Sequence, residues 1–227
     1  VGTPQGGLIS PILANVYLHY VLDLWFEKCI KKQLYGKAYL VRFADDFLIM
    51  FQYESDAQRV YEAVIKRMEL FGLELSKEKT RILPFGRYSG SRETFDFLGF
   101  THFNSKTRKG YYTVGHKISR KKKKQFKSNL KKWVKENRNT QFDEFMKALN
   151  KKLTGSFNYY SLSGMIKEVR NLWHHSLYVT FKWINRRSQR RSFKLERFCE
   201  IWNDRIIHPY IHVDIWSGDK VIYNKNV

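Results

Sequence analysis

Residues 39–52, YLVRFADDFLIMFQ, place two adjacent aspartates, Asp45 and Asp46, between two short apolar runs. The flanking runs are rich in aromatic and aliphatic residues, which predicts two buried strands joined by a tight turn. A turn that only reverses the chain favours Asn-Gly or Asp-Gly, whereas neighbouring carboxylates repel each other unless a cation lies between them. The stretch therefore indicates either a solvated acidic turn or a divalent-metal site at a hairpin tip.

The composition indicates a globular protein with a polyanionic partner. The chain has 227 residues, of which 43% are hydrophobic, and this is ample for a core. Its 42 Lys and Arg against 21 Asp and Glu give a formal net charge of +21. Such an excess favours nucleic acid as the partner, with a merely soluble basic protein as the alternative. Two cysteines far apart in the sequence favour reduced thiols and a cytoplasmic location, and no apolar run is long enough to span a membrane.

The first half of the sequence alternates helix and strand patterns. A Gly/Pro-rich loop leads to Ser10-Pro11, a favourable helix start, and a dense apolar stretch then predicts a mostly buried helix. After the acidic hairpin, apolar residues at helical spacing predict a second helix that ends at Gly72. Residues 73–85 (LELSKEKTRILPF) predict a strand, a turn and another strand. FDFLGFTHF and GYYTVG predict a hairpin around the loop NSKTRKG.

The second half is basic and helical. Between Phe97 and Lys135 there is no Asp or Glu, and the run SRKKKKQFKSNLKKWVK concentrates lysines. Helical periodicity covers residues 117–137, 142–160 and 164–187, and a short helix is expected in the last segment. We therefore predict an α+β fold, in which an antiparallel sheet with packed helices precedes a basic, all-α three-helix module.

Carboxylates on a rigid hairpin fit a chemistry that depends on divalent cations. Mg²⁺ prefers carboxylate oxygens together with waters and phosphates, and the addition of nucleotides to a primer uses two such cations a few ångströms apart. Two buried strands would aim the carboxylates rigidly. In this interpretation Asp45 is the direct ligand, and Asp46 is a weaker ligand or a support.

Four motifs occur in a characteristic order: PQGGLISPILANVYL, RFADD, LELSKEKTRIL and FDFLGF. Together with the lysine-rich helices that follow, they resemble reverse transcriptases of group II introns and bacterial retroelements, including intron-encoded maturases. The resemblance implies a palm with an antiparallel sheet at residues 1–115, a three-helix thumb at 116–187 and a C-terminal extension at 188–227. It also implies an RNA-directed DNA polymerase that extends a primer 3′ end by two-metal catalysis with Mg²⁺ or Mn²⁺.

The resemblance assigns roles to single residues. Asp45 and Asp46 would bind the metals, next to a phenylalanine where the family usually has tyrosine. Lys79 of SKEKT would neutralise charge near the triphosphate or protonate pyrophosphate, with a solvated turn lysine as the alternative. The expected nucleotide- or template-binding residues are Gln5, Gly6, Phe43 and Ala44. The expected primer grip is Leu98 and Gly99, whose aromatic neighbours are equally well explained as core.

Basic residues of the helical module are expected to contact the nucleic-acid backbone. Contacts of this kind are sensitive to salt and largely independent of sequence. In maturases the arginine-rich region NRRSQRRSFKLERF would bind structured intron RNA, and a solvated basic linker is the alternative. His174 and His175 are adjacent on a predicted helix, and we assign them no chemistry. The expected backbone contacts are Lys121, Lys122, Lys123, Lys124, Lys127, Lys131, Arg186 and Arg187.

The expected partners are an RNA template paired with a DNA primer, dNTP and structured intron RNA. The family's polymerase site uses a further aspartate and a fingers segment that precede the PQGG motif. The chain is therefore expected to be an incomplete portion that binds nucleic acid and is inactive alone, with an upstream fingers/palm polypeptide as another partner. The alternative function is a non-catalytic, RNA-binding maturase-like module that assists intron splicing.

Overall fold

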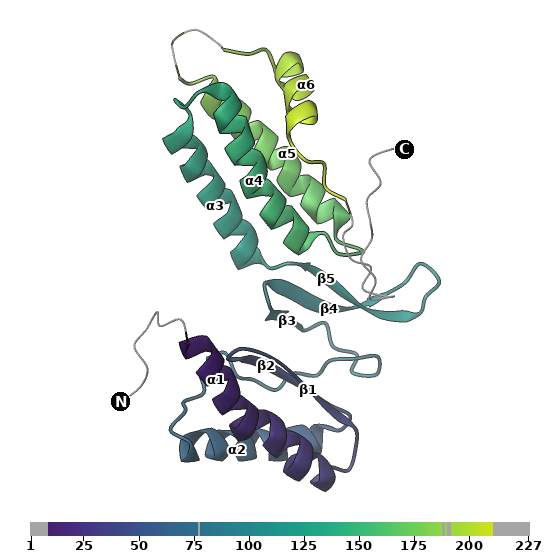
Figure 1. The fold of residues 1–227 in the computed structure, drawn as a ribbon. Coiled ribbons are helices and arrows are strands. Elements are labelled where there is room, and N and C mark those ends of the chain that lie inside the picture. Colours follow the sequence, from purple (N-terminus) through teal and green to yellow (C-terminus); the bar gives the residue numbers. More distant parts are fainter. Residues whose placement is uncertain (1–8, 77, 188, 190–191, 211–227) are drawn as a thin grey trace. The chain divides into compact units, whose positions relative to one another are not determined.

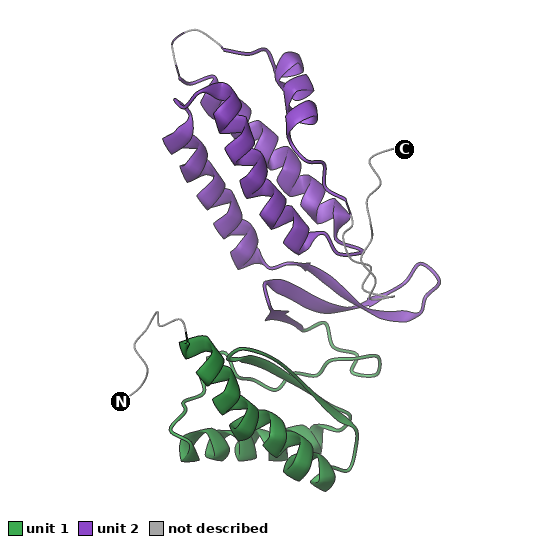
Figure 2. Ribbon diagram, in the orientation of Figure 1, with its two compact units in different colours: residues 1–93 green, residues 94–227 purple. Residues whose placement is uncertain are grey.

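The structure is a computed structural model that describes residues 9–76, 78–187, 189 and 192–210. The chain divides into two compact units, residues 1–93 and residues 94–227, which Figure 2 colours separately. Both combine helices with antiparallel strands (Figure 1), which confirms the mixed α+β class. The predicted single sheet is wrong in detail, because the described strands form a two-stranded and a three-stranded sheet.

The first unit packs helices against one face of the predicted hairpin. The two strands pair antiparallel, with Phe43 opposite Asp46 at the tip. The second predicted helix is present and begins three residues after the hairpin. In chain order the elements are α1 (Ser10–Leu18), the π-helical segments η1 (His19–Asp23) and η2 (Phe26–Ile30), the 3-10 turn η3 (Lys31–Gln33), β1 (Ala38–Phe43), β2 (Asp46–Phe51) and α2 (Glu54–Leu70).

The two strands predicted to be buried are buried on one face of the hairpin only. Successive side chains of a strand point to opposite faces. Leu40 and Ile49 pack on the core formed around Leu22 and Phe26, whereas Val41 and Phe43 are 45% and 64% exposed. Within the first unit, the hairpin therefore packs on the core through one face only.

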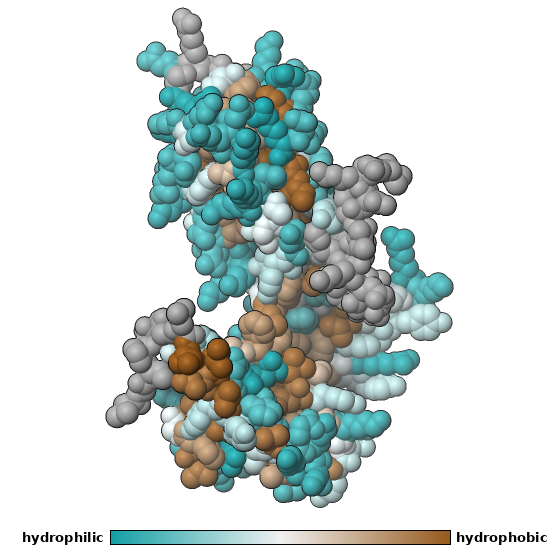
Figure 3. Space-filling model, in the orientation of Figure 1, coloured by the Kyte–Doolittle hydropathy of each residue, from teal (hydrophilic) through white to brown (hydrophobic). Residues whose placement is uncertain are grey.

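The first helix is also more exposed than its apolar sequence predicted. Helix α1 has no buried residue, and Ile12 and Val16 are 63% and 50% exposed. Figure 3 shows this face as a hydrophobic patch on α1. The burial predicted for the helix is found further along, at Val21, Leu22 and Phe26 of the π-helical segments.

Residues 73–93 contain the predicted turn but not the predicted strands. The backbone N–H of Lys79 donates to the carbonyl of Ser76 at 3.0 Å, which closes the turn. The described residues on either side of the turn belong to neither of the two sheets.

The second unit joins a three-stranded sheet to a helical bundle. Strand order is β3-β4-β5, all antiparallel. The hairpin predicted around NSKTRKG is the β4–β5 pair, and a second hairpin, β3–β4, turns at Leu98-Gly99. The elements are β3 (Thr94–Phe97), β4 (Phe100–Lys106), β5 (Tyr112–Ile118), α3 (Arg120–Asn137), α4 (Phe142–Tyr160), α5 (Ile166–Ile184) and α6 (Leu195–Arg205).

The three predicted basic helices and the short final helix are all present. Helix α3 begins three residues later than predicted, because Ile118 still belongs to β5 and Ser119 caps the helix by accepting from the N–H of Lys122 at 3.4 Å. Leu130 and Val134 are buried beneath the lysines of α3. The bundle core around Leu149 and Trp202 also takes in Phe100 and Ile118 from the sheet, so sheet and bundle share one core.

Two further sequence expectations concern the cysteines and membrane-spanning helices. Cys29 and Cys199 are both free thiols, as predicted. Among the described helices, none combines the length and the apolar character needed to cross a bilayer.

Candidate active-site turn and nucleic-acid surface

The FADD motif forms a two-residue turn between β1 and β2. Ala44 and Asp45 occupy the loop, and Asp46 is the first residue of β2. Ala44 has φ +53°, in the left-handed region, which costs a non-glycine residue about 1 kcal/mol or more. Ala44 and Leu98 are the two non-glycine residues with positive φ among the described residues. Both lie in motifs that the sequence marked as functional.

The carboxylates of this turn are accessible to a ligand. Asp45 and Asp46 are exposed, and in the described part of the chain neither forms an ion pair. No group of three or more His, Cys, Asp and Glu capable of holding a metal occurs among the described residues. Two carboxylates fit Mg²⁺, which proteins commonly bind through one or two carboxylates completed by waters and substrate phosphates.

Arg42, which the sequence did not indicate as a site residue, hydrogen-bonds to the backbone of the turn. Its Nη1 donates to the carbonyl oxygen of Ala44 at 2.8 Å and to Asn15 Oδ1 at 2.8 Å. Its Nε and Nη2 donate to the two carboxylate oxygens of Asp23 at 2.8 and 2.7 Å. The available signal was an arginine inside an otherwise apolar strand, which needs a partner when it is buried.

Of the other residues predicted near the nucleotide, the structure describes Phe43 and Lys79. Phe43 is exposed at the end of β1, and Lys79 is exposed in the turn after Ser76. Gln5 and Gly6 lie outside the described residues.

The predicted primer grip is the turn between β3 and β4. Leu98 and Gly99 have φ +50° and +83°, and positive φ at both central residues is the pattern of a type I′ turn. The carbonyl of Leu98 accepts from the Tyr159 hydroxyl at 2.6 Å, and that of Gly99 accepts from the Ser119 N–H at 2.9 Å. A Cβ at position 99 would lie 3.5 Å from the Lys122 side chain. Helices α3 and α4 therefore fix this turn.

Most of the predicted phosphate-binding cations are exposed. Lys123 is different, because it forms an ion pair with Glu168 of α5. Arg187 donates to Ser192 Oγ at 3.4 Å, just beyond α5. Arg190 and Arg191, in the same basic run, lie outside the described residues. The exposed members of the predicted set are Lys121, Lys122, Lys124, Lys127, Lys131 and Arg186.

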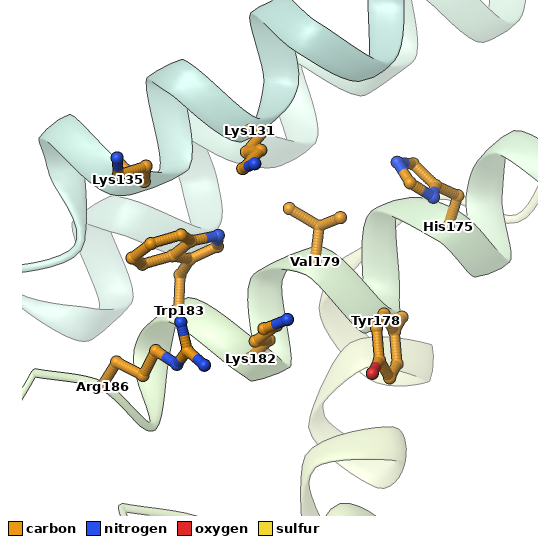
Figure 4. Close-up of a pocket in the computed structure, with 8 residues that line it drawn as sticks. All are labelled: Lys131, Lys135, His175, Tyr178, Val179, Lys182, Trp183 and Arg186. Carbon is orange, nitrogen blue, oxygen red and sulfur yellow. The ribbon is translucent and has the colours of Figure 1, made fainter.

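A groove of about 540 Å³ between α3 and α5 adds further cations to this surface (Figure 4). In Figure 4, Lys131 and Lys135 extend from α3 toward α5, and Trp183 points toward Lys135. The Trp183 ring centroid lies 4.9 Å from Lys135 Nζ and 5.3 Å from the Arg186 guanidinium. The residues lining the groove, none of them acidic, are Lys131, Lys135, His175, Tyr178, Val179, Lys182, Trp183 and Arg186. We call this set the α3–α5 groove.

The spacing of the basic residues in the sequence is a signal for this groove. Lys131 and Lys135 are four residues apart, as are Lys182 and Arg186, so each pair shares one face of its helix. His175, to which the sequence assigned no chemistry, lines the groove. Burial, followed by the nearby charge of Lys127, lowers the pKa of His175, so this residue is mainly neutral at pH 7 and the lysines and arginine carry the charge.

Two family models match parts of this chain. Residues 1–102, which include the FADD turn and the Leu98-Gly99 turn, match the family model for reverse transcriptase (RNA-dependent DNA polymerase). Residues 123–199, which include the α3–α5 groove, match the model for the group II intron maturase-specific domain. None of the curated proteins matches the chain. The two matches together support a group II intron-type reverse transcriptase/maturase.

Proposed function

We propose that this chain supplies the metal-binding turn and the nucleic-acid-binding helices of an RNA-directed DNA polymerase that extends a primer 3′ end. The observation that carries the proposal is the turn itself: one exposed carboxylate on a strained two-residue loop and a second at the strand residue that follows it, backed by a packed hairpin. Strained backbone conformations are concentrated at functional sites. In this proposal residues 1–115 act as the palm, residues 116–187 as the thumb and residues 188–227 as an extension.

The palm residues would bind and orient the reactants. Asp45 would be the direct ligand of Mg²⁺ or Mn²⁺, and Asp46 a second ligand or support. When bound, the cations activate the primer 3′ oxygen and neutralise the triphosphate. The exposed ring of Phe43 and the backbone of Ala44 would contact the incoming nucleotide or template, together with Gln5 and Gly6. Lys79 would neutralise charge on the triphosphate.

The primer-grip turn and the thumb residues would hold the duplex and structured RNA. The Leu98-Gly99 turn presents backbone to the primer, and its two carbonyls are already bonded to Tyr159 and Ser119, so its position is set before the primer binds. The exposed lysines of α3, with Arg186 and Arg187, would contact phosphates. Lys123 would instead hold α3 to α5 through Glu168. The α3–α5 groove extends this surface with Lys135 and Lys182.

We infer that these 227 residues do not polymerise by themselves. Only Asp45 and Asp46 are available at the turn, since the described residues contain no larger cluster of metal-binding side chains. Two cations held a few ångströms apart need more ligands than one such pair. A further carboxylate and a fingers segment would complete the site. The cytoplasmic location remains a prediction.

Primer extension tests the proposal. The chain is combined with a fingers segment of a related reverse transcriptase and assayed with an RNA template, a DNA primer, dNTP and Mg²⁺. We expect extension that Asp45→Ala abolishes and that Asp204→Ala, which removes an exposed carboxylate from α6, leaves unchanged.

The alternative is a non-catalytic module that assists intron splicing, and the match to the maturase-specific domain is the observation in its favour. Stimulated splicing of a group II intron RNA without primer extension, unaffected by Asp45→Ala, would support this alternative against polymerase function.

A further inference from the structure

Arg42 lies directly before the FADD turn and has no role in the function proposed above. We propose that Arg42 is a positioning residue, which fixes the carbonyl of Ala44 and thereby aims the carboxylates of Asp45 and Asp46. Asn15 and Asp23 in turn hold Arg42. The inference rests on the proposed metal-binding function of this turn.

The hydrogen bonds of Arg42 connect three separate segments of the first unit. Asp23, in η1, accepts from Nε and Nη2 in a bidentate arrangement at 2.8 and 2.7 Å. Asn15, in α1, accepts from Nη1 at 2.8 Å and donates through its own Nδ2 to the carbonyl of Pro11 at 3.0 Å. This second bond sets which way the Asn15 amide faces. The bonds to Asp23 and Asn15 therefore orient the Arg42 guanidinium independently of its bond to the turn.

The contact with Ala44 restrains the peptide group directly before Asp45. Nη1 donates to the carbonyl of Ala44 at 2.8 Å, and this carbonyl belongs to the peptide that links Ala44 to Asp45. Ala44 is in the left-handed region with φ +53°, a conformation that persists only when surrounding contacts determine it. Loss of the Arg42 bond would let this peptide rotate and would displace the Asp45 carboxylate.

Arg42 acts through hydrogen bonds and not as a counter-ion of the metal site. Its side chain is only 12% exposed and its charge is compensated by Asp23. The hydrogen bond from Arg42 is the main cause that lowers the pKa of Asp23, ahead of the opposing effect of burial. In the described structure Arg42 forms its ion pair with Asp23, which leaves Asp45 and Asp46 to a ligand.

Lysine cannot replace this geometry. The substitution Arg42→Lys would keep the positive charge beside Asp23, but one ammonium group cannot reproduce a planar fork that bonds a carboxylate, an amide and a carbonyl together. A matched control exists in the same unit: Arg59 bonds the Asp56 carboxylate at 3.0 Å and the carbonyl of Gln33 at 2.7 Å. Arg59→Lys therefore makes the same chemical change away from the FADD turn.

The test measures Mn²⁺ affinity by paramagnetic broadening of the Ala44, Asp45 and Asp46 amide signals in the whole chain. Loss of a residue that orients metal ligands typically costs about tenfold or more in metal affinity. We expect a loss of about tenfold for Arg42→Lys. We expect a smaller loss for Asp23→Asn, which keeps Arg42, and no loss for Arg59→Lys. The carbonyl ¹³C shift of Ala44, measured without metal, should change in Arg42→Lys and report the broken hydrogen bond.

The possible failures can be told apart. Wild-type Mn²⁺ affinity in Arg42→Lys, while Asp45→Asn abolishes binding, would overturn the positioning role and leave the metal site intact. An equal loss in Arg42→Lys and Arg59→Lys would reduce the role of Arg42 to general stability and overturn the inference. Broadening in the wild type that Asp45→Asn does not change would overturn the metal site, and with it the role of Arg42. If Arg42→Lys does not fold, wild-type affinity in Asp23→Asn overturns the inference.

Discussion

The salt dependence of RNA binding gives a quantitative test of the α3–α5 groove. Four cations line it: Lys131, Lys135, Lys182 and Arg186. If each contacts one phosphate of a single strand, the groove contributes about −2.8 to the slope of log K against log [salt], at about −0.7 per phosphate. Affinity at this surface then falls about 50-fold between about 50 mM and about 200 mM salt. The double variant Lys131→Ala/Lys182→Ala should lower the magnitude of the total slope by about 1.4.

The assay is fluorescence anisotropy of a single-stranded RNA across a salt series. The control, Lys147→Ala/Lys151→Ala, removes the same charge from exposed positions of α4 that do not line the groove. We expect its slope to match the wild type. Equal slope changes in the two double variants would show that only net charge matters, and this result would refute the groove as a binding surface.

Three further predictions concern stability. Leu149→Ala, at a side chain with no exposed surface in the bundle core, should lower the free energy of unfolding in urea by about 3 kcal/mol. Gly115→Ala would bring a Cβ within 2.5 Å of the Phe103 ring; it should lower that free energy by about 1–3 kcal/mol, and Phe103→Leu in the same chain should restore part of it. The pKa of Asp23 is lowered from its ordinary value of 3.8, so its stabilisation is present above that pH and is lost as the pH falls through the lowered pKa. The stability difference between wild type and Asp23→Asn, followed by urea unfolding, should therefore be large at neutral pH and shrink in acid.

Local patterns predicted the secondary structure well where an element depends on its own residues. The bounds of α4 match the periodic segment 142–160, because a buried apolar stripe specifies a helix without reference to the rest of the fold. The FADD hairpin was predictable for a similar reason, since two apolar runs flank a two-residue break.

Expectations that depend on distant partners were less successful. The apolar sequences of α1 and β1 predicted burial, but Ile12 of α1 and Val41 of β1 are exposed. Residues 73–85 have strand-like composition, yet a strand also needs a neighbouring backbone, which composition does not specify. Exposure and strand pairing are tertiary properties, and they had to come from the structure.

The candidate site also combines a feature that the local sequence predicts with one that depends on distant residues. The carboxylates of Asp45 and Asp46 were recognisable as a pair in the sequence. The contact between Arg42 and the Ala44 carbonyl was not, because Asn15 and Asp23 are far from Arg42 in the sequence and meet it only after folding.

The central claim is that the FADD turn binds the catalytic metal, and anomalous diffraction tests it most directly. Crystals of the chain with a primer–template duplex would be soaked in Mn²⁺. The account predicts an anomalous peak at the Asp45 carboxylate, at a coordination distance of about 2.1 Å as for Mg²⁺, which disappears in Asp45→Asn. An ordered, exposed turn with no peak, while Mn²⁺ binds elsewhere on the chain, would contradict the account.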